Sequence, residues 1–521
     1  MQLVIVVLAV LGLLCCSTAA AAADTLELVL VQLIHRHGAR SPLTPANASL
    51  VCPRGCGLLN YQGKDMLLKQ GEYLRGRYNG SRPDVFNSTT PFFASELYPS
   101  GTTYDVRQVY SRSTDLTRTL QSATGLLKGL FPNETEYFPA VSTVQFLQDQ
   151  LLLIDVSPSY HIYQQLDANK FTAQLKVFVD GVFPDHSVVT AMSVENLIDG
   201  YCSGEGSWVY VNCILTLQDI AAARNAEGRL SSLTVTQQYF QQLNSVREQW
   251  NAYYFPFNAS NAVNVARGSL GQNIVQRMLQ NMFSAIASAA KAPTNPDLAD
   301  FPYKLMHYSA HDTTVMPYCA TLGNDGYMLP PFGQLYLLDL LRNSSDGSYH
   351  VRAAQSVPGQ TPESMHSVTE SVFPLHCIRE DGTPYTVTSI TGTCPLYDFQ
   401  RYINSSLPQS PDGTCYLAPE ALAAIDCDVI GGDGPLPNTT CYFYRSYCST
   451  VACPNGTMLS PSTYACVVLS TTSVGGSVSS GIVAAAVVAS AFASFFAALF
   501  VAKLWGRRKA AKGGKYTVVA S

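Results

Sequence analysis

The chain has 521 residues, enough for two or three folded units, and only 13% of them are charged. The formal net charge is −5, which excludes the basic excess that is typical of proteins that bind nucleic acid. Because charged residues are few, the places where they gather carry information about function.

The chain begins with an apolar segment at residues 3–14, which is followed by the small residues "CCSTAAAAAD". This pattern predicts a signal peptide over residues 1–23, although no basic residue precedes the apolar run. An uncleaved anchor is the alternative, but a run of this length is short for a membrane span.

A second apolar segment, residues 481–501, contains no charged residue. At about 1.5 Å per residue, a helix of this length spans about 30 Å, the thickness of a bilayer core. The basic residues that follow predict a cytosolic tail at 502–521 and a type I membrane protein. They also argue against a lipid anchor, whose signal would end in its apolar part.

Glycosylation sites and cysteines also indicate that the region between the two apolar segments is lumenal or extracellular. Asn-x-Ser/Thr occurs nine times, always between the two apolar segments. Thirteen cysteines lie outside the signal peptide, and five crowd into residues 427–466 without metal-ligand spacing. They predict disulfides, a Cys-rich stalk and linker at 427–480, and one free thiol, for which Cys319 is the candidate. The nine sites are Asn47, Asn79, Asn87, Asn133, Asn258, Asn343, Asn404, Asn438 and Asn455.

Three apolar runs read as strands. "LELVLVQLI" at 26–34 favours a strand buried on both faces, and "DVRQVYSR" and "YKLMHYSAHD" end near Arg112 and Ala310. A helical pattern follows the second run, with Ser113, Thr114 and Asp115 as candidate caps. The alternation predicts an α/β fold with a largely parallel sheet between helices. Residues 133–293 are mostly helical in pattern and are interpreted as an inserted cap.

Each of these strands is predicted to end in charged or titratable residues. Ligands of open parallel sheets bind outside the carboxyl ends of the strands, so these side chains are expected to form one site. The expected set is Arg36, His37 and Arg40 after the first strand, Arg112 at the end of the second, and His311 and Asp312 after the third.

Several guanidinium groups in one site indicate a phosphoryl ligand. The sequence has no P-loop and no cluster with metal-ligand spacing, so neither a cofactor nor a metal is expected. A neutral histidine can attack phosphorus, and nearby arginines favour its neutral form. Asp312 can protonate the leaving group, which predicts activity at acidic pH. Gly38 is expected to let the chain turn and to leave room for the ligand.

At these residues the chain resembles the histidine acid phosphatases. "RHGARSP" matches their RHGxRxP signature, "SRSTDLTRT" and "YSAHDTTV" match two further motifs, and "LPPFGQLYLLDLL" is a partial match. The resemblance runs from about residue 26 to 415 and implies a phosphoglycerate mutase-like domain with a helical cap, placed here at 24–426. It implies a disulfide between Cys377 and Cys394, and it is compatible with a homodimer.

The resemblance also implies residue roles. His37 would be the nucleophile that becomes phosphohistidine, and Asp312 would be the proton donor. Arg36, Arg40, Arg112 and His311 would bind the phosphate. His35, His307 and Arg118 are interpreted as structural.

The leading functional prediction is a metal-independent acid phosphatase that acts on phosphomonoesters. The alternatives are a phytase or lysophosphatidate-type phosphatase of the same superfamily, or a non-catalytic membrane glycoprotein receptor. The tail sequence "YTVV", with Tyr516 and Val519, fits an endosomal sorting signal that binds adaptors. The expected location is the endosomal and lysosomal membrane, with the plasma membrane as the alternative.

Overall fold

The computed structural model describes residues 26–468, apart from 44–46, 134–138, 146–147, 155–157, 205, 292–300, 438 and 455. The expected signal peptide, membrane span and tail, including Tyr516 and Val519, lie outside the described residues. Within the described part, every helix is too short or too polar to cross a membrane.

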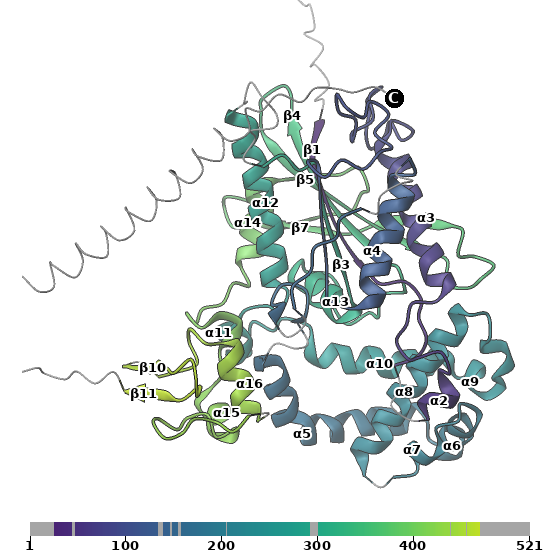
Figure 1. The fold of residues 1–521 in the computed structure, drawn as a ribbon, viewed down its shortest axis with the longest axis vertical. Coiled ribbons are helices and arrows are strands. Elements are labelled where there is room, and N and C mark those ends of the chain that lie inside the picture. The colour runs from purple at the N-terminus through teal and green to yellow at the C-terminus, as the bar shows by residue number, and fades with distance from the viewer. Residues whose placement is uncertain are drawn as a thin grey trace, which may run out of the picture.

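A single large sheet forms the centre of the molecule (Figure 1), with the strand order β2-β3-β1-β4-β5-β6 and with β9 paired to β5. Its members are β1 (Leu26–Arg36), β2 (Val109–Ser113), β3 (Leu305–Ala310), β4 (Leu335–Asn343), β5 (Tyr349–Pro358), β6 (Val368–Val372) and β9 (Cys394–Pro395).

The prediction of a largely parallel sheet is wrong, because the sheet is mixed. Only the pairings of β3 with β1 and with β2 are parallel. The pairings of β1 with β4, β4 with β5, and β5 with β6 and β9 are all antiparallel. For β4 and β5 the physical reason is their connection, which is too short to hold the crossover helix that a parallel pair requires.

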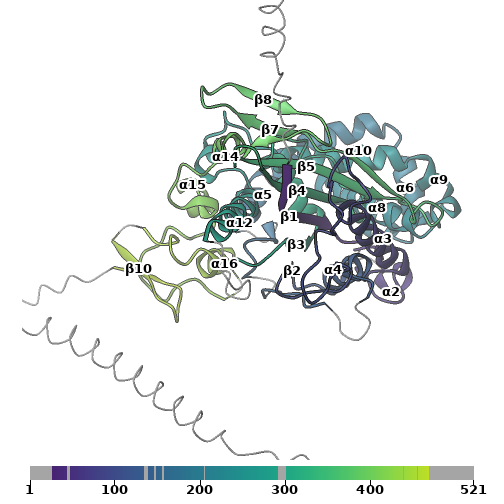
Figure 2. The same cartoon turned by 90° about the horizontal axis from the view of Figure 1, so that it is seen from above.

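Helices cover both faces of the sheet (Figure 2). Strand β1 has Leu30 and Ile34 in one apolar cluster and Val31 and Leu33 in the other. This alternation confirms a strand that is buried on both faces. The first cluster includes α12 (Gln272–Lys291), α13 (Asp312–Thr321) and α14 (Leu396–Asn404), and the second includes α3 (Tyr61–Tyr78) and α4 (Thr117–Leu130).

A helical unit lies beyond the carboxyl ends of β1, β2 and β3 (Figure 1) and has an apolar core of its own. Helix α12 falls inside the range predicted for the cap, but Ile274, Val275 and Met278 pack it against the sheet. The inserted helices are α5 (Pro158–Val182), α6 (His186–Glu195), α7 (Asp199–Cys202), α8 (Ser207–Ala226), α9 (Thr234–Gln238), α10 (Phe240–Tyr254) and α11 (Ala262–Arg267).

The Cys-rich segment forms a compact unit that packs on α5 through Ile162. Arg445 lies at its centre and donates hydrogen bonds to the carbonyls of Cys427, Val429 and Tyr464. The unit contains α15 (Pro419–Ala424), α16 (Thr440–Tyr447), β10 (Thr457–Leu459) and β11 (Cys466–Val468). Its disulfides are Cys415–Cys448, Cys427–Cys441 and Cys453–Cys466.

Three further disulfides brace the remainder of the described chain: Cys52–Cys56, Cys202–Cys213 and Cys377–Cys394. The last is the pair that the family resemblance implies, and it lies beside the hairpin of β7 (Leu375–Ile378) and β8 (Pro384–Val387). Cys319 is free and buried, as expected.

Helices α3 and α4 pack backbone against backbone, and glycines make this possible. A Cβ on Gly71 would lie 2.0 Å from the carbonyl oxygen of Leu126, and one on Gly129 would lie 2.0 Å from that of Leu68. A Cβ on Gly76, in the same helix as Gly71, would have no heavy atom within 4 Å.

This contrast gives a test of the packing. Gly71→Ala should lower the free energy of unfolding by at least about 2 kcal/mol, because the helices must separate. Gly76→Ala should raise it by about 0.5–1 kcal/mol through the helix propensity of alanine. Calorimetric melting of both variants and the parent checks this. Equal melting temperatures for the two variants would contradict the close packing.

Candidate active site

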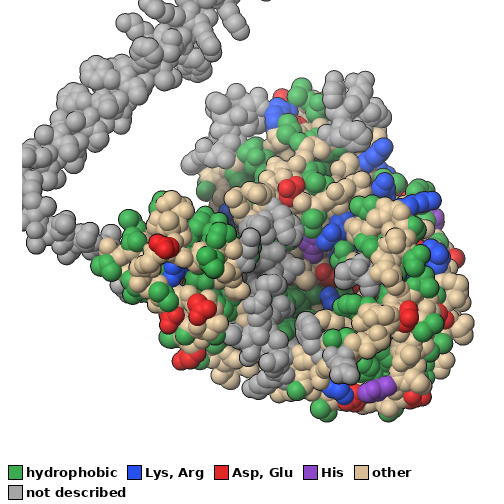
Figure 3. Space-filling model, turned by 60° about the horizontal axis from the view of Figure 1, so that its bottom comes forward, with side chains coloured by type: hydrophobic (Ala, Val, Ile, Leu, Met, Phe, Trp, Pro, Cys, Tyr) green, Lys and Arg blue, Asp and Glu red, His purple; other side chains and the backbone are tan. Residues whose placement is uncertain are grey.

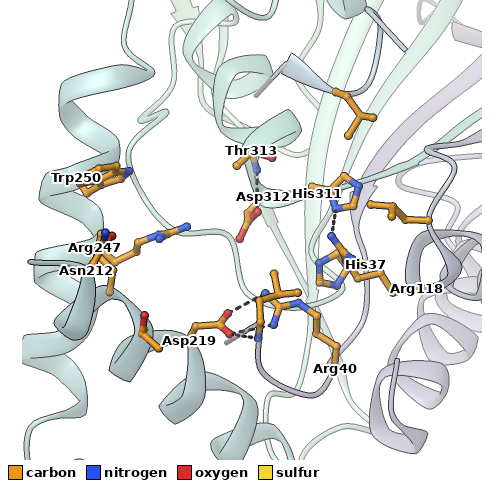
Figure 4. Close-up of a pocket in the computed structure, with 15 residues that line it drawn as sticks. His37, Arg40, Arg118, Asn212, Asp219, Arg247, Trp250, His311, Asp312 and Thr313 are labelled. Atoms are coloured by element: carbon orange, nitrogen blue, oxygen red, sulfur yellow. Dashed lines mark hydrogen bonds and ion pairs between the residues drawn. The ribbon is translucent and has the colours of Figure 1, made fainter. Parts of the chain in front are cut away.

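The charged strand ends open into a cavity of about 370 Å³ between the sheet and helices α8 and α10. Figure 3 shows basic, acidic and histidine side chains gathered in a hollow of this face, and Figure 4 shows them from inside. The lining residues are His37, Arg40, Leu43, Leu116, Arg118, Leu153, Asn212, Leu215, Thr216, Asp219, Arg247, Trp250, His311, Asp312 and Thr313.

His37 is the first residue after β1, and its backbone N–H donates to the carbonyl of Ala310 at 3.0 Å. Its Nδ1 lies 2.8 Å from the carbonyl oxygen of Gly38. A carbonyl can only accept, so Nδ1 carries the proton and Nε2 keeps a free lone pair. Burial lowers the pKa of His37 well below its ordinary value, and Arg40 and Arg36 lower it further. The imidazole is therefore neutral.

The two arginines of the first motif are held by carboxylates. Arg36 pairs with Asp312 at 2.8 Å, and Arg40 pairs with Asp219 at 2.8 Å. Phe332 lies beneath them, with its ring centroid 4.3 Å from the guanidinium carbon of Arg36 and 5.7 Å from that of Arg40. These contacts fix both guanidinium groups beside His37 without a ligand.

Asp312 begins α13, and its side chain is mostly but not fully buried. Burial alone would raise its pKa, but Arg36, then Arg247, His37 and Arg40, outweigh burial and hold the pKa far below its ordinary value. Its Oδ1 also accepts a hydrogen bond from the backbone N–H of Thr313 at 2.9 Å. The carboxyl group is therefore ionised while the cavity holds no anion.

His311 precedes Asp312 and lies edge-on to His37, with 5.6 Å between the ring centroids. Its Nδ1 accepts from a guanidinium nitrogen of Arg118 at 3.4 Å, and its Nε2 lies 2.9 Å from Oγ1 of Thr114. Since Arg118 can only donate, Nε2 carries the proton. Burial, followed by Arg118, lowers the pKa of His311 to about 3.

Two predicted site residues, Arg36 and Arg112, are absent from the cavity lining. Arg36 still pairs with Asp312, which lines the cavity, whereas Arg112 is directed elsewhere. The guanidinium of Arg112 pairs with the buried Asp149. Arg112 pairs in register with Tyr308 of β3, and Tyr308 belongs to the apolar cluster on the face of α12 and α13. Strand alternation therefore directs Arg112 away from the cavity.

Arg118 lines the cavity instead and contacts His311, although the sequence placed it outside the site. The helix begins later than expected, at Thr117, and its N-cap, Leu116, makes no side-chain hydrogen bond. Ser113 completes β2, and Thr114 contacts His311. The motif "SRSTDLTRT" contains both Arg112 and Arg118. The sequence does not tell which of the two points into the cavity, whereas the structure does.

The two histidines that were interpreted as structural, His35 and His307, lie outside the cavity lining. Nε2 of His35 lies 2.9 Å from Nε2 of His307, whose Nδ1 lies 2.9 Å from Oγ of Ser111. Both rings are fully buried away from the cavity.

Gly38 has a different role from the expected one. A Cβ there would lie 2.1 Å from the carbonyl oxygen of Gly63 in α3, so glycine is required by a neighbouring backbone. Its φ angle is not in the left-handed region. The backbone N–H of Gly38 donates to Oγ of Ser122 at 3.1 Å.

Sequence reasoning missed the residues that α8 and α10 contribute: Asn212, Asp219, Arg247 and Trp250. They belong to no motif, and polar residues on the helices of a cap look alike in a sequence. Phe332 lies in the segment "LPPFGQLYLLDLL", which already carried a partial resemblance. Among the residues with a described position, no three His, Cys, Asp or Glu side chains form a group that could hold a metal ion.

Comparison with known proteins gives consistent matches. The family model described as "Histidine phosphatase superfamily (branch 2)" matches residues 50–353, more than half of the chain. Lysosomal acid phosphatase of Xenopus laevis is 26% identical over 417 residues, covering 75% of this chain and 80% of that protein. Prostatic acid phosphatase of Mus musculus is 25% identical over 397 residues, covering 74% and 87%.

Among solved structures, the phytase of Klebsiella sp. ASR1 aligns with a TM-score of 0.47 at 16% identity, over 76% of this chain and all of that one. The range matched by the family model contains the inserted helices and the strands β2 to β4, together with His311 and Asp312. The chain therefore belongs to branch 2 of the histidine phosphatase superfamily, the family of the histidine acid phosphatases.

Proposed function

We propose that the chain is an acid phosphatase that hydrolyses phosphomonoesters through a phosphohistidine on His37. The observation that carries this proposal is the hydrogen bond from Nδ1 of His37 to the carbonyl of Gly38. It leaves Nε2 unprotonated inside a cavity lined by guanidinium groups. The curated relatives whose alignments cover about three quarters of this chain are named acid phosphatases.

In the first step, Nε2 of His37 forms a bond to phosphorus while the bond from phosphorus to the ester oxygen breaks. Asp312 gives a proton to the departing oxygen. Arg36, Arg40 and Arg118 hold the phosphate oxygens and offset the charge of the transition state. His311 contacts the same group, and a bound anion favours its protonated form. In the second step, water donates a proton to Asp312 and its oxygen displaces His37 from phosphorus.

Asp312 must be protonated in the first step, although the empty cavity keeps it ionised. A bound phosphate group competes for Arg36 and adds negative charge beside the carboxylate, so binding raises the pKa of Asp312. Acidic solution supplies this proton more readily, so we expect the activity to be highest at acidic pH.

The alternative of a phytase receives less support from the cavity. Four leucines line it, namely Leu43, Leu116, Leu153 and Leu215. An inositol polyphosphate would require several more cations in their place. A purely receptor role is disfavoured by the intact set of nucleophile, proton donor and arginines.

The proposal extends to the organisation and location of the chain. A signal peptide, a phosphatase domain at 24–426, a Cys-rich unit, a span at 481–501 and a cytosolic tail would give a type I membrane protein. Relatives named lysosomal acid phosphatase support the lysosomal system. The plasma membrane is the alternative location. Adaptor binding through Tyr516 and Val519 would favour the endosomal and lysosomal system over the plasma membrane.

The nucleophile can be tested directly. His37→Ala should lower the hydrolysis of p-nitrophenyl phosphate by at least about 10³-fold, since it removes the imidazole that attacks phosphorus. The assay contains a metal chelator, and His366→Ala is the control because His366 is largely exposed. Hydrolysis that survives in a folded His37→Ala protein would refute the proposal.

The pH dependence follows from the low pKa of His37. A nucleophile whose pKa lies well below 6.5 stays unprotonated in acid, so kcat/KM should remain high as the pH falls through 6.5. A profile from about pH 3.5 to 8 measures this, and we expect the acid limb well below the ordinary histidine value. An acid limb centred near the ordinary value would contradict a buried, arginine-flanked imidazole.

The two arginines of the second motif can be separated by matched substitutions. Arg118→Gln should lower kcat/KM by about 10²-fold or more, because it removes a phosphate ligand. Arg112→Gln should mainly lower the melting temperature, because it leaves the buried Asp149 without its cation. The assignment fails if Arg112→Gln loses activity at unchanged stability while Arg118→Gln retains it.

A further inference from the structure

The cavity has a second wall that the hydrolysis of a bare phosphate does not require. Helix α8 contributes Asn212 and α10 contributes Arg247 and Trp250, on the side away from β1 (Figure 4). A phosphate held at His37 would present its leaving group to this wall. The side chains there are therefore placed to select among phosphomonoesters.

Arg247 is the cation of this cavity without a partner of its own. Arg36 pairs with Asp312, Arg40 with Asp219, and Arg118 contacts His311. Among the residues that the structure places, none forms a hydrogen bond or ion pair with the Arg247 side chain, and its Nε is buried without a partner. An arginine kept unpaired in a partly buried position indicates a missing anionic ligand.

The direction of Arg247 supports the same conclusion. Figure 4 shows its side chain extending from α10 into the cavity toward Asp312. It also acts electrostatically on Asp219 and Asp312, so it faces the site and not the solvent beyond α10. It lies across the cavity from the strand ends, where the transferring phosphate would be held, so its natural partner is a different group.

Trp250 lies one helical turn after Arg247 and lines the same cavity. Its ring packs against Tyr254 with 5.2 Å between centroids, which fixes it as a wall. Together with the four leucines of the lining, it offers an apolar surface to the body of the leaving group. Arg247 beside this apolar surface would suit a leaving group that carries one negative charge on an apolar or aromatic framework.

We propose that Arg247 and Trp250 form a leaving-group subsite, and that the preferred substrates are phosphate esters of alcohols or phenols that carry one carboxylate. This proposal rests on the proposed phosphatase function and names its substrate class. Arg247 acts by binding the carboxylate of the leaving group, while Arg36, Arg40 and Arg118 hold the phosphate.

The test compares two substrates that differ only in charge: 4-carboxyphenyl phosphate and its neutral amide, 4-carbamoylphenyl phosphate. The quantity measured is the ratio of their kcat/KM values at about pH 5.5, where an ordinary carboxylic acid is ionised. Comparing this ratio between proteins cancels the different reactivities of the two phenols. The proteins are the full chain, Arg247→Gln, Arg247→Lys and Arg229→Gln.

We expect Arg247→Gln to lower the ratio by about 10-fold, and Arg247→Lys to keep most of it because the charge remains. Arg229→Gln makes the same substitution at an exposed position on the cap and should leave the ratio unchanged. Melting temperatures confirm that each variant is folded.

Two results would overturn the subsite. An unchanged ratio in a folded Arg247→Gln protein would show that Arg247 does not read the charge of the leaving group. An equal loss for both substrates would show that it holds the transferring phosphate instead. Failure of the phosphatase function is distinguishable, because then the parent protein would hydrolyse neither ester or His37→Ala would hydrolyse both.

Discussion

Repulsion among buried and partly buried guanidinium groups is the constraint on which the site depends. Arg36, Arg40, Arg118 and Arg247 all act on one small cavity, and their charges would drive the strand end away from the cap if they were left uncompensated. Asp312 and Asp219 hold the two innermost arginines from opposite sides. Burial, and then the same positive charge, lower the pKa of His37 and keep its ring neutral, so the arrangement that attracts a phosphate also prepares the nucleophile.

These two carboxylates join different parts of the fold. Asp312 starts α13 of the sheet domain, whereas Asp219 comes from α8 of the inserted helices. The ion pair between Arg40 and Asp219 therefore fastens the cap to the segment that carries His37. Asp219 also accepts from the backbone N–H of Leu43 at 2.6 Å, which extends the attachment along the same segment.

Much of this site could be predicted because its residues follow strands whose apolar pattern is strong. β3 ends where expected and β1 ends two residues later than its apolar run, which places His37 beside His311 and Asp312. The directions of Arg112 and Arg118 could not be predicted, because they depend on which face of β2 carries Arg112 and on where α4 begins. The antiparallel half of the sheet was missed because buried strands of both kinds have the same apolar composition. The contributions of α8 and α10 leave no pattern in a sequence, since they are single polar residues on amphipathic helices.

The buried pair of His35 and His307 affects the stability of the folded enzyme at acidic pH. Burial lowers the pKa of His35 to about 4, whereas an unfolded chain takes up this proton near pH 6.5. Between those two pH values the unfolded state binds more protons than the folded state. As the pH falls through this range, the free energy of unfolding therefore decreases by about 1.4 kcal/mol per pH unit for one such group. The pKa of His307 is lowered well below 6.5 by the same burial, which adds to the effect. Acidic pH would thus lower the stability of the folded enzyme. The six disulfides of the described chain oppose this loss of stability, because their effect does not depend on protonation.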